Sequence, residues 1–149
     1  MSYTLKFSIG DAVTNSTIRE TFGCSLQGGM RKSNKTNSLV LVCDHTKVLY
    51  EDKWKGDVLH YTGMGQNGDM SLDFMQNKTL AQSNSNGVEV HLFEVLERSQ
   101  YIYRGQVYLC DEPYQETQPD ENGTIRRVWI FPLKLKDVKK LFDENIDRD

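Results

Sequence analysis

Short runs in which apolar and polar residues alternate dominate this chain, and they predict a mostly β protein. The runs are residues 3–9 (YTLKFSI), Val58–Tyr61, Val88–Val95, Tyr101–Cys110 and Arg126–Leu133. Such alternation is typical of a strand that packs one face on a core. Ser38–Cys43 (SLVLVC) is apolar throughout, which indicates a strand buried on both faces.

Helical signals are fewer than strand signals. Thr17 and Glu20 have the spacing of a capping box and Gly23 is a C-terminal stop, so they predict one short helix. Residues 70–87 carry a weaker helical pattern that ends in an Asn/Ser/Gly turn. Lys136–Asn145 predicts a terminal helix followed by a frayed tail, so that about residues 137–149 lie outside the sheet.

Together these elements predict one α+β domain over residues 1–149. A mixed or antiparallel sheet would curl into a small β-barrel with a few flanking helices, and Asp120–Gly123 would form a hairpin-type turn before the last strand. A chain of 149 residues is long enough to bury one core. It shows no internal repeat and no linker that would divide it.

The composition narrows the class of protein. With 38% hydrophobic and 26% charged residues, it is that of a soluble globular protein. No run reaches the roughly 18 apolar residues of a membrane helix, and the N-terminus lacks the apolar core of a signal peptide, so we expect a cytoplasmic protein without a membrane partner. The net charge of −3 argues mildly against coating nucleic acid by bulk charge, but it leaves room for a local basic face.

Residues suited to catalysis or metal binding are sparse in the sequence. Cys24, Cys43 and Cys110 are widely spaced and show no C-x-x-C or Cys/His pairing, so they predict idle or buried thiols. The three histidines lie on different segments, and no two carboxylates have a spacing that implies acid/base work. We therefore predict no catalytic residue, no metal site and no cofactor.

The stretch Tyr50–Leu80 concentrates aromatic, acidic and glycine residues, and we take it as the functional site. Gly63, Gly65 and Gly68 match the G-x-G-x-x-G of dinucleotide-binding loops. We reject that interpretation, because the motif has to open the helix of a βαβ unit and a polar segment follows here. The glycines instead allow close approach of the backbone to another ligand.

Four residues of this stretch, Tyr50, Asp52, Tyr61 and Thr62, have the composition needed to hold one planar heterocycle. Two Tyr rings can sandwich a base, and a carboxylate can accept from its amine. The backbone of Thr62 and Gly63 can meet the rest of the base edge. An alternative stays open, in which Tyr61 is a core residue of a strand and Tyr50 anchors a loop.

Basic residues lie in segments that flank this stretch, despite the acidic total. A flexible basic loop at residues 25–37 suits contact with a phosphate backbone, although a simple solvated loop has the same composition. The candidates for phosphate contact are Arg31, Lys32, Lys35, Lys53, Lys55 and Lys78.

The strings TFGCSLQGGM (residues 21–30), YTGMGQNGDM (residues 61–70) and HLFE (residues 91–94) resemble the SRA (SET and RING associated) domain. They are most similar to the SRA-like modules of bacterial modification-dependent HNH endonucleases of the McrA type, and the resemblance extends over about residues 4–135. It implies a PUA-like β-barrel that flips a 5-methyl- or 5-hydroxymethylcytosine out of duplex DNA into a pocket.

The resemblance also implies a role for each pocket residue. Tyr61 and Tyr50 would stack on the flipped base, and Asp52 would accept from its N4 amine. Thr62 and Gly63 would contact its Watson–Crick edge.

Two parts of the site have several candidates under this resemblance. Trp54 is an alternative to Tyr50 as the second ring. Gln66 or Asn67, or else Arg31 or Lys32, would fill the gap that the flipped base leaves in the duplex.

The resemblance implies a non-catalytic recognition module of a modification-dependent restriction system. Its partners would be double-stranded DNA with modified cytosine and an HNH or other nuclease domain, fused or separate. Two alternatives are a PUA-like reader of RNA or of another modified base, and an enzyme that acts on a base or nucleotide with Asp52 or Asp69 in the same pocket.

Overall fold

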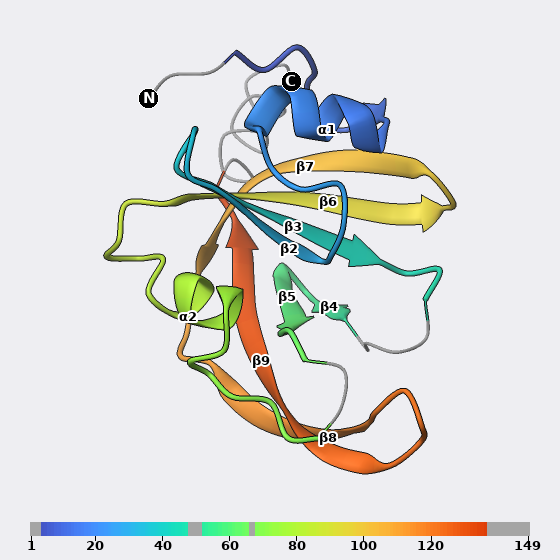
Figure 1. The fold of residues 1–149 in the computed structure, drawn as a ribbon, viewed down its shortest axis with the longest axis vertical. Coiled ribbons are helices and arrows are strands. Elements are labelled where there is room, and N and C mark those ends of the chain that lie inside the picture. The colour runs from blue at the N-terminus through green and yellow to red at the C-terminus, as the bar shows by residue number, and fades with distance from the viewer. Residues whose placement is uncertain (1–3, 48–51, 66–67, 137–149) are drawn as a thin grey trace, which may run out of the picture.

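The computed structural model describes residues 4–47, 52–65 and 68–136, and within these ranges it is a strongly bent sheet with two short helices (Figure 1). The elements in chain order are β1 (Ala12–Val13), α1 (Asn15–Phe22), β2 (Met30–Ser33), β3 (Ser38–Asp44), β4 (Lys53–Lys55), β5 (Val58–Thr62), α2 (Gln76–Ala81), β6 (Glu89–Glu97), β7 (Gln100–Leu109), β8 (Tyr114–Pro119) and β9 (Ile125–Leu135).

The strands form one sheet with the order β2-β3-β6-β7-β9-β5-β4, while β1 pairs with β7 and β8 pairs with β9. The pair β3 and β6 is parallel, and the other pairs are antiparallel. The sheet is therefore mixed, as the sequence predicts. Its path does not close between β2 and β4, so it is a curled open sheet and a barrel only in a loose sense.

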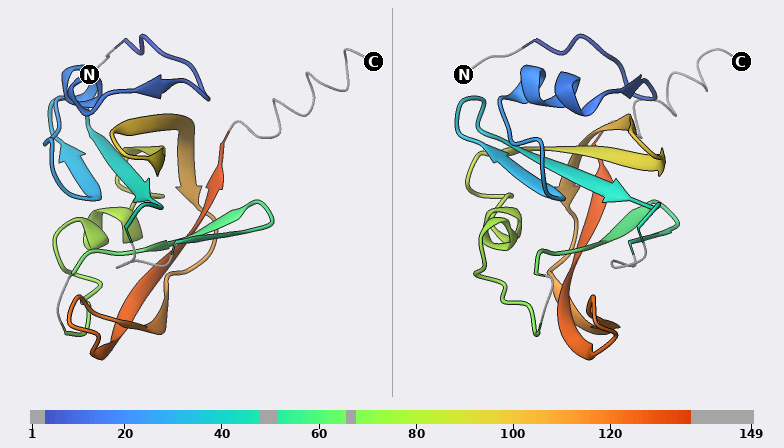
Figure 2. Two further views of the ribbon diagram at one scale, coloured as in Figure 1. Left: turned by 90° about the vertical axis from the view of Figure 1, so that its right-hand side faces the viewer. Right: turned by 45° about the vertical axis from the view of Figure 1, so that its right-hand side comes forward.

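The long strand β9 connects the two ends of the molecule (Figures 1 and 2). Its first part pairs with β8, its middle with β5 and its last residues with β7. The β8–β9 turn is closed by the amide of Asp120, which donates to the carbonyl of Thr124, and by the amide of Gly123, which donates to the carbonyl of Asp120. This confirms the hairpin turn expected at Asp120–Gly123.

Both faces of β3 are buried, as its apolar run predicts. Leu39, Leu41 and Cys43 belong to one core cluster, which also contains Tyr61 of β5 and residues of α2, β6, β7 and β9. Val40 and Val42 belong to a second cluster, beneath α1. The sheet therefore separates these two cores at β3, and the candidate site borders both, through Tyr61 of the first and Val42 of the second. A third, smaller cluster contains Met70, Val128 and Ile130.

The first helix, α1, covers the second core. Thr14 is its N-cap and accepts a hydrogen bond from the amide of Thr17 at 3.1 Å, while Gly23 ends it in the left-handed conformation at φ 75°. Ile18 and Phe22 are its buried residues. The stop at Gly23 is as predicted, but the cap lies three residues before the expected capping box, because Thr14 has the extended backbone that a cap requires.

A buried histidine joins this core to the sheet. His91 of β6 is 0% exposed, and its Nδ1 lies 2.8 Å from the hydroxyl of Tyr103 on β7. Its ring packs against Phe22 of α1 at a centroid distance of 4.6 Å. Burial lowers the pKa of His91 to about 4, against the effect of Glu89, which raises it.

Several strand predictions differ from the structure. Residues 4–9 are not a strand: the amide of Ser8 donates to the carboxylate of Asp11, and Phe7 packs its ring on the second core. The alternating pattern there reflects one partly buried ring and not a strand. The terminal helix expected at Lys136–Asn145 lies outside the described residues beyond its first position.

Four short strands, β1, β2, β4 and β8, were not predicted. β2 lies inside the expected basic loop, and β8 is a polar edge strand of which only Gln118 is buried. The strands expected at Val88–Val95, Tyr101–Cys110 and Arg126–Leu133 correspond to β6, β7 and β9, and the weak helical pattern in residues 70–87 corresponds to α2. Among the described residues, no helix has the length and apolar character to cross a membrane.

Candidate base-binding pocket

A cavity of about 690 Å³ opens where the end of β5 meets the loop before β2. Its walls come from segments far apart in the sequence: the loop and first residues of β2, the ends of β3 and β5, the segment before α2, and the start of β7. The lining residues are Leu26, Gln27, Gly28, Gly29, Met30, Arg31, Val42, Asp44, Lys47, Asp52, Tyr61, Thr62, Gly63, Met64, Gly65, Phe74, Met75 and Tyr101.

Tyr61 forms a fixed wall of this cavity. It is only 2% exposed, and its hydroxyl donates to the carbonyl oxygens of Gly29 at 2.9 Å and Val42 at 3.2 Å. It therefore joins β5 to the loop before β2 and to β3. Tyr61 is a core residue, as one of the two interpretations of the sequence has it, and it also lines the cavity. Its predicted contact with a base stays a prediction.

Asp52 lies in the cavity wall beside Thr62, and its Oδ1 accepts the amide hydrogen of Thr62 at 2.7 Å. It is also hydrogen-bonded to the thiol of Cys43. Burial raises the pKa of the Asp52 carboxyl, and the hydrogen bonds from Thr62 and Cys43 oppose that rise. Asp52 is thus a desolvated acceptor whose orientation is set by the strand that it faces.

Thr62 and Gly63 are buried, and hydrogen bonds connect them to β8 and β9. The Thr62 hydroxyl lies 3.4 Å from Nε2 of Gln118 on β8, and the amide of Gly63 donates to the carbonyl of Trp129 at 2.9 Å. A Cβ at position 63 would lie 2.6 Å from Oδ1 of Asn77, closer than non-bonded atoms approach. Glycine is needed here because there is no space for a side chain.

The loop after Gly63 is fastened by two buried side chains. Oδ1 of Asn77 accepts from the amide of Met64 at 2.7 Å, and its Nδ2 donates to the carbonyls of Met64 and Ser71, each at 3.0 Å. Arg126 of β9 donates from Nη1 to the carbonyls of Gly65 and Gly68. The glycine-rich loop is therefore bound at both ends to the sheet and to α2.

Several predicted site residues lie in or at the cavity. Asp52, Tyr61, Thr62, Gly63 and Arg31 all line it. Arg31 is 5% exposed, and it donates from Nε to the carbonyl of Gly28 at 2.7 Å and from Nη1 to the side chain of Asn15. Its guanidinium supports the cavity wall rather than extending into solvent.

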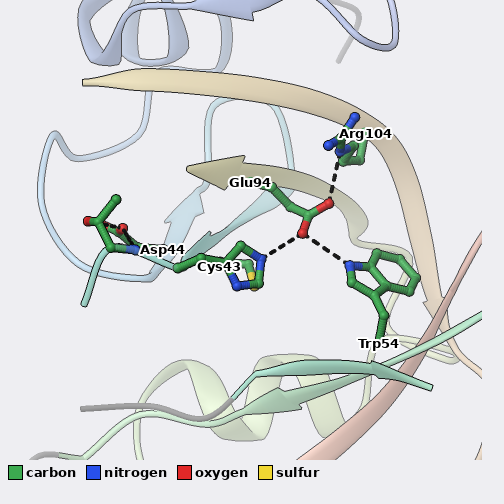
Figure 3. Close-up of polar contacts among 7 residues, drawn as sticks. Cys43, Asp44, Trp54, Glu94 and Arg104 are labelled. Atoms are coloured by element: carbon green, nitrogen blue, oxygen red, sulfur yellow. Dashed lines mark hydrogen bonds and ion pairs between the residues drawn. The ribbon is translucent and has the colours of Figure 1, made fainter. Parts of the chain in front are cut away.

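Other predicted residues lie elsewhere or outside the described structure. Trp54 donates from Nε1 to Glu94 at 3.0 Å and does not line the cavity (Figure 3). The lysines at positions 32, 35, 53, 55 and 78 are not among its lining residues either, and all but Lys32 are exposed. Tyr50, Gln66 and Asn67 lie outside the described residues, so their predicted roles stay predictions.

The cavity also contains residues that the sequence did not single out. Tyr101 lines it, and the guanidinium carbon of Arg31 lies 5.9 Å from the centroid of its ring. Phe74 and Met75 line it as well and are 45% and 60% exposed. Met75 has a φ of 46°, which is rare for a residue with a side chain. No local pattern marked these residues, because they reach the cavity only through the tertiary fold.

Fold and cavity together define an SRA-type domain of the PUA-like class. Comparison with solved structures gives the same fold. One is a structure of the sulfur-binding and SRA domains of ScoMcrA in complex with phosphorothioated DNA, with a TM-score of 0.71 and 16% identity over 88% of this chain and 40% of that one. The chain belongs to the family of ScoMcrA-like SRA domains, whose family model matches residues 9–145.

Two further structures share the fold. The SUVH5 SRA domain in complex with fully methylated CG DNA has a TM-score of 0.65 and 23% identity over 91% of this chain and 94% of that one. The modification-dependent restriction endonuclease TagI has a TM-score of 0.59 and 20% identity over 89% of this chain and 51% of that one. No curated protein sequence matches the chain. At these identities the likenesses concern the fold alone.

This chain spans well under half of the first two structures that it resembles. It corresponds to 40% of the chain with the sulfur-binding domain and to 28% of the full restriction endonuclease ScoMcrA. The match is therefore to the SRA part of these larger proteins.

Proposed function

We propose that this domain binds duplex DNA that carries a 5-methyl- or 5-hydroxymethylcytosine and flips that base into the cavity beside Tyr61. The observation that carries the proposal is that a half-buried carboxylate and an aromatic ring line the same cavity. Asp52 and Tyr61 both line the cavity, and Asp52 is fixed by the amide of Thr62. The proposal agrees with the family to which the chain belongs.

The cavity has the size and chemistry that a flipped base requires. Its volume of about 690 Å³ is within the range of roughly 300–1,000 Å³ that is usual for small-ligand sites. An ionised carboxylate has about four acceptor positions, so Asp52 can accept from Thr62, from Cys43 and from a cytosine N4 amine together. Unmodified and modified cytosines both offer that amine, so Asp52 selects the base and not its modification.

Stacking on the base needs a second ring opposite Tyr61. Among the described residues that line the cavity, Tyr101 and Phe74 are the other aromatic side chains. Base-aromatic stacking contributes about 1–3 kcal/mol per base, which offsets the few kcal/mol that unstacking and unpairing cost. We infer that Tyr101 or Phe74, if not Tyr50, supplies this ring.

The structures that share this fold support DNA as the ligand and a restriction system as the biological context. The SUVH5 structure contains methylated DNA, the ScoMcrA structure contains phosphorothioated DNA, and TagI is a modification-dependent restriction endonuclease. We infer that this chain is a non-catalytic recognition module, with a nuclease domain supplied by a fused or separate chain.

A binding titration tests the proposal. Fluorescence anisotropy with three duplexes that differ only at one cytosine (unmodified, 5-methyl and 5-hydroxymethyl) should give several-fold tighter binding for a modified duplex. Burying one methyl group contributes on the order of 0.8 kcal/mol, which corresponds to about fourfold in affinity. Equal affinities for all three would contradict the proposal, and tighter binding to an RNA of the same sequence would favour the RNA-reader alternative.

Asp52→Asn is the matched variant for this titration. The amide keeps the size of the side chain and an oxygen for the amide of Thr62, but its NH₂ group then faces the cytosine amine. We expect Asp52→Asn to bind all three cytosine duplexes more weakly, while its urea denaturation midpoint stays close to that of the parent. Cleavage or base conversion by the parent protein with divalent metal would instead favour the enzyme alternative.

A further inference from the structure

A second polar cluster lies beside the cavity, where β3 and β6 pair in parallel. Cys43 and Glu94 are direct partners in the register of these strands, and His45 follows Cys43 by two residues. The side chains of all three converge, and one ligand atom from each lies within 4.8 Å of the others. The three residues were not singled out from the sequence as a cluster, because Glu94 is far from Cys43 along the chain.

The distances within the cluster are short. Nε2 of His45 lies 2.7 Å from Oε2 of Glu94 and 3.4 Å from Sγ of Cys43. Cys43 is 0% exposed and the Glu94 side chain is 7% exposed, whereas the His45 side chain is 30% exposed. The cluster is therefore closed on the core side and reachable from solvent at His45.

Outer hydrogen bonds hold the carboxylate of this cluster in place (Figure 3). Nε of Arg104 donates to Oε1 of Glu94 at 2.8 Å, and Nε1 of Trp54 donates to Oε2 at 3.0 Å. Such outer donors are typical of protein metal sites, where they orient the ligands.

We propose that Cys43 Sγ, His45 Nε2 and Glu94 Oε2 bind one thiophilic divalent ion, with Zn²⁺ as the ion that their donor set matches best. Zinc takes thiolate at about 2.3 Å and imidazole or carboxylate at about 2.0 Å in tetrahedral geometry, which places sulfur and nitrogen roughly 3.5 Å apart. The observed 3.4 Å fits this value. A small rotation of the exposed His45 ring would lengthen the 2.7 Å contact to the roughly 3.3 Å that nitrogen and oxygen ligands require.

The charges nearby also suit a dication. Glu94 and Asp52 place two carboxylates near Cys43, and Arg104 supplies one positive charge beside Glu94. Burial and these carboxylates raise the pKa of the Cys43 thiol, so the sulfur stays protonated until a divalent ion displaces its proton. Binding releases the thiol proton of Cys43 to solvent. His45 then carries its remaining proton on Nδ1, since Nε2 is the ligand atom.

Titration with Co²⁺ tests the proposal, because a cobalt–thiolate bond has a charge-transfer band in the near ultraviolet. We expect the full chain to show this band, saturating at one Co²⁺ per chain, and Zn²⁺ to abolish it by competition. His45→Ala removes a half-exposed side chain and should weaken Co²⁺ binding by at least about tenfold. Trp54→Phe should weaken it by about 10- to 100-fold through loss of an outer donor.

Two cysteine variants separate this site from nonspecific thiol binding. Cys43→Ala should lose the band, whereas Cys110→Ala, which removes a partly exposed thiol outside the cluster, should keep it. No band in the parent chain, or a band that Cys43→Ala and His45→Ala leave unchanged, would overturn the proposal. Should Cys43→Ala fail to fold, the His45→Ala result alone decides.

Discussion

Single residues at this site belong to the packed core and to the cavity wall at once. Tyr61 shows this most clearly, because its ring lines the cavity while its hydroxyl bridges Gly29 and Val42. Tyr61→Ala would remove a core side chain at a cost of about 3–5 kcal/mol, so loss of binding in that variant would say little about the base. Asp52→Asn is more informative, because it changes the chemistry of the site and keeps its volume.

Gly63→Ala should destabilise the domain by about 1–3 kcal/mol. The added Cβ would lie 2.6 Å from Oδ1 of Asn77 and 2.9 Å from a ring carbon of Phe131, and both neighbours are buried. Urea denaturation measures the change. Gly29→Ala is the matched control, since its Cβ would meet only the hydroxyl of Tyr61 at 3.3 Å and the carbonyl of Val42 at 3.5 Å. Equal losses in the two variants would contradict this account.

Among the elements, α1 is the one whose stability depends most clearly on its N-cap. Only two of its residues are buried, so its ends contribute a large share of its stability. The structure assigns the N-cap to Thr14, whereas the spacing of Thr17 and Glu20 had indicated a later start. Pattern rules locate a helix better than its first residue, because the cap depends on backbone angles that the tertiary fold selects.

Thr14→Ala should therefore reduce the free energy of unfolding by about 1 kcal/mol, since the amide of Thr17 loses its acceptor. Glu20→Ala, at an exposed position, should change it by less than about 0.5 kcal/mol. Urea denaturation of both variants checks the pair. If Glu20→Ala reduced the free energy of unfolding more than Thr14→Ala, the capping box of Thr17 and Glu20 that the sequence predicts would be correct instead.

At the scale of the whole molecule, the sequence predicted the strands with strong patterns but not how they converge. Ser38–Cys43 and four of the five alternating runs correspond to β3, β5, β6, β7 and β9, because burial of one or both faces leaves a local signature. One cavity wall, Tyr61-Thr62-Gly63, was also found in advance. The lining residues Tyr101 and Phe74 were not, because they are distant from Tyr61 in the chain and reach the cavity only through the tertiary fold.

The buried His91 makes the stability of the whole domain sensitive to acid. Its pKa is lowered to about 4 in the fold, against about 6.5 in an unfolded chain, so the unfolded state binds a proton first as pH falls. Stability should be full above about pH 6.5 and decline toward pH 4. The free energy of unfolding, measured in urea at several pH values, should fall less steeply between about pH 6.5 and 5 in His91→Gln. The same slope in both proteins would contradict this role.

The parallel pairing of β3 with β6 has a consequence for the order of folding. Neighbouring parallel strands need a long connection, and here residues 45–88 supply it, with β4, β5, the glycine-rich loop and α2 inside. Half of the residues that line the cavity therefore come from one crossover segment. The ends of this segment come together only when β3 and β6, which are distant in the sequence, pair. Because such closure is slow, we expect the hairpin of β6 and β7 to form early and the binding site to be completed late.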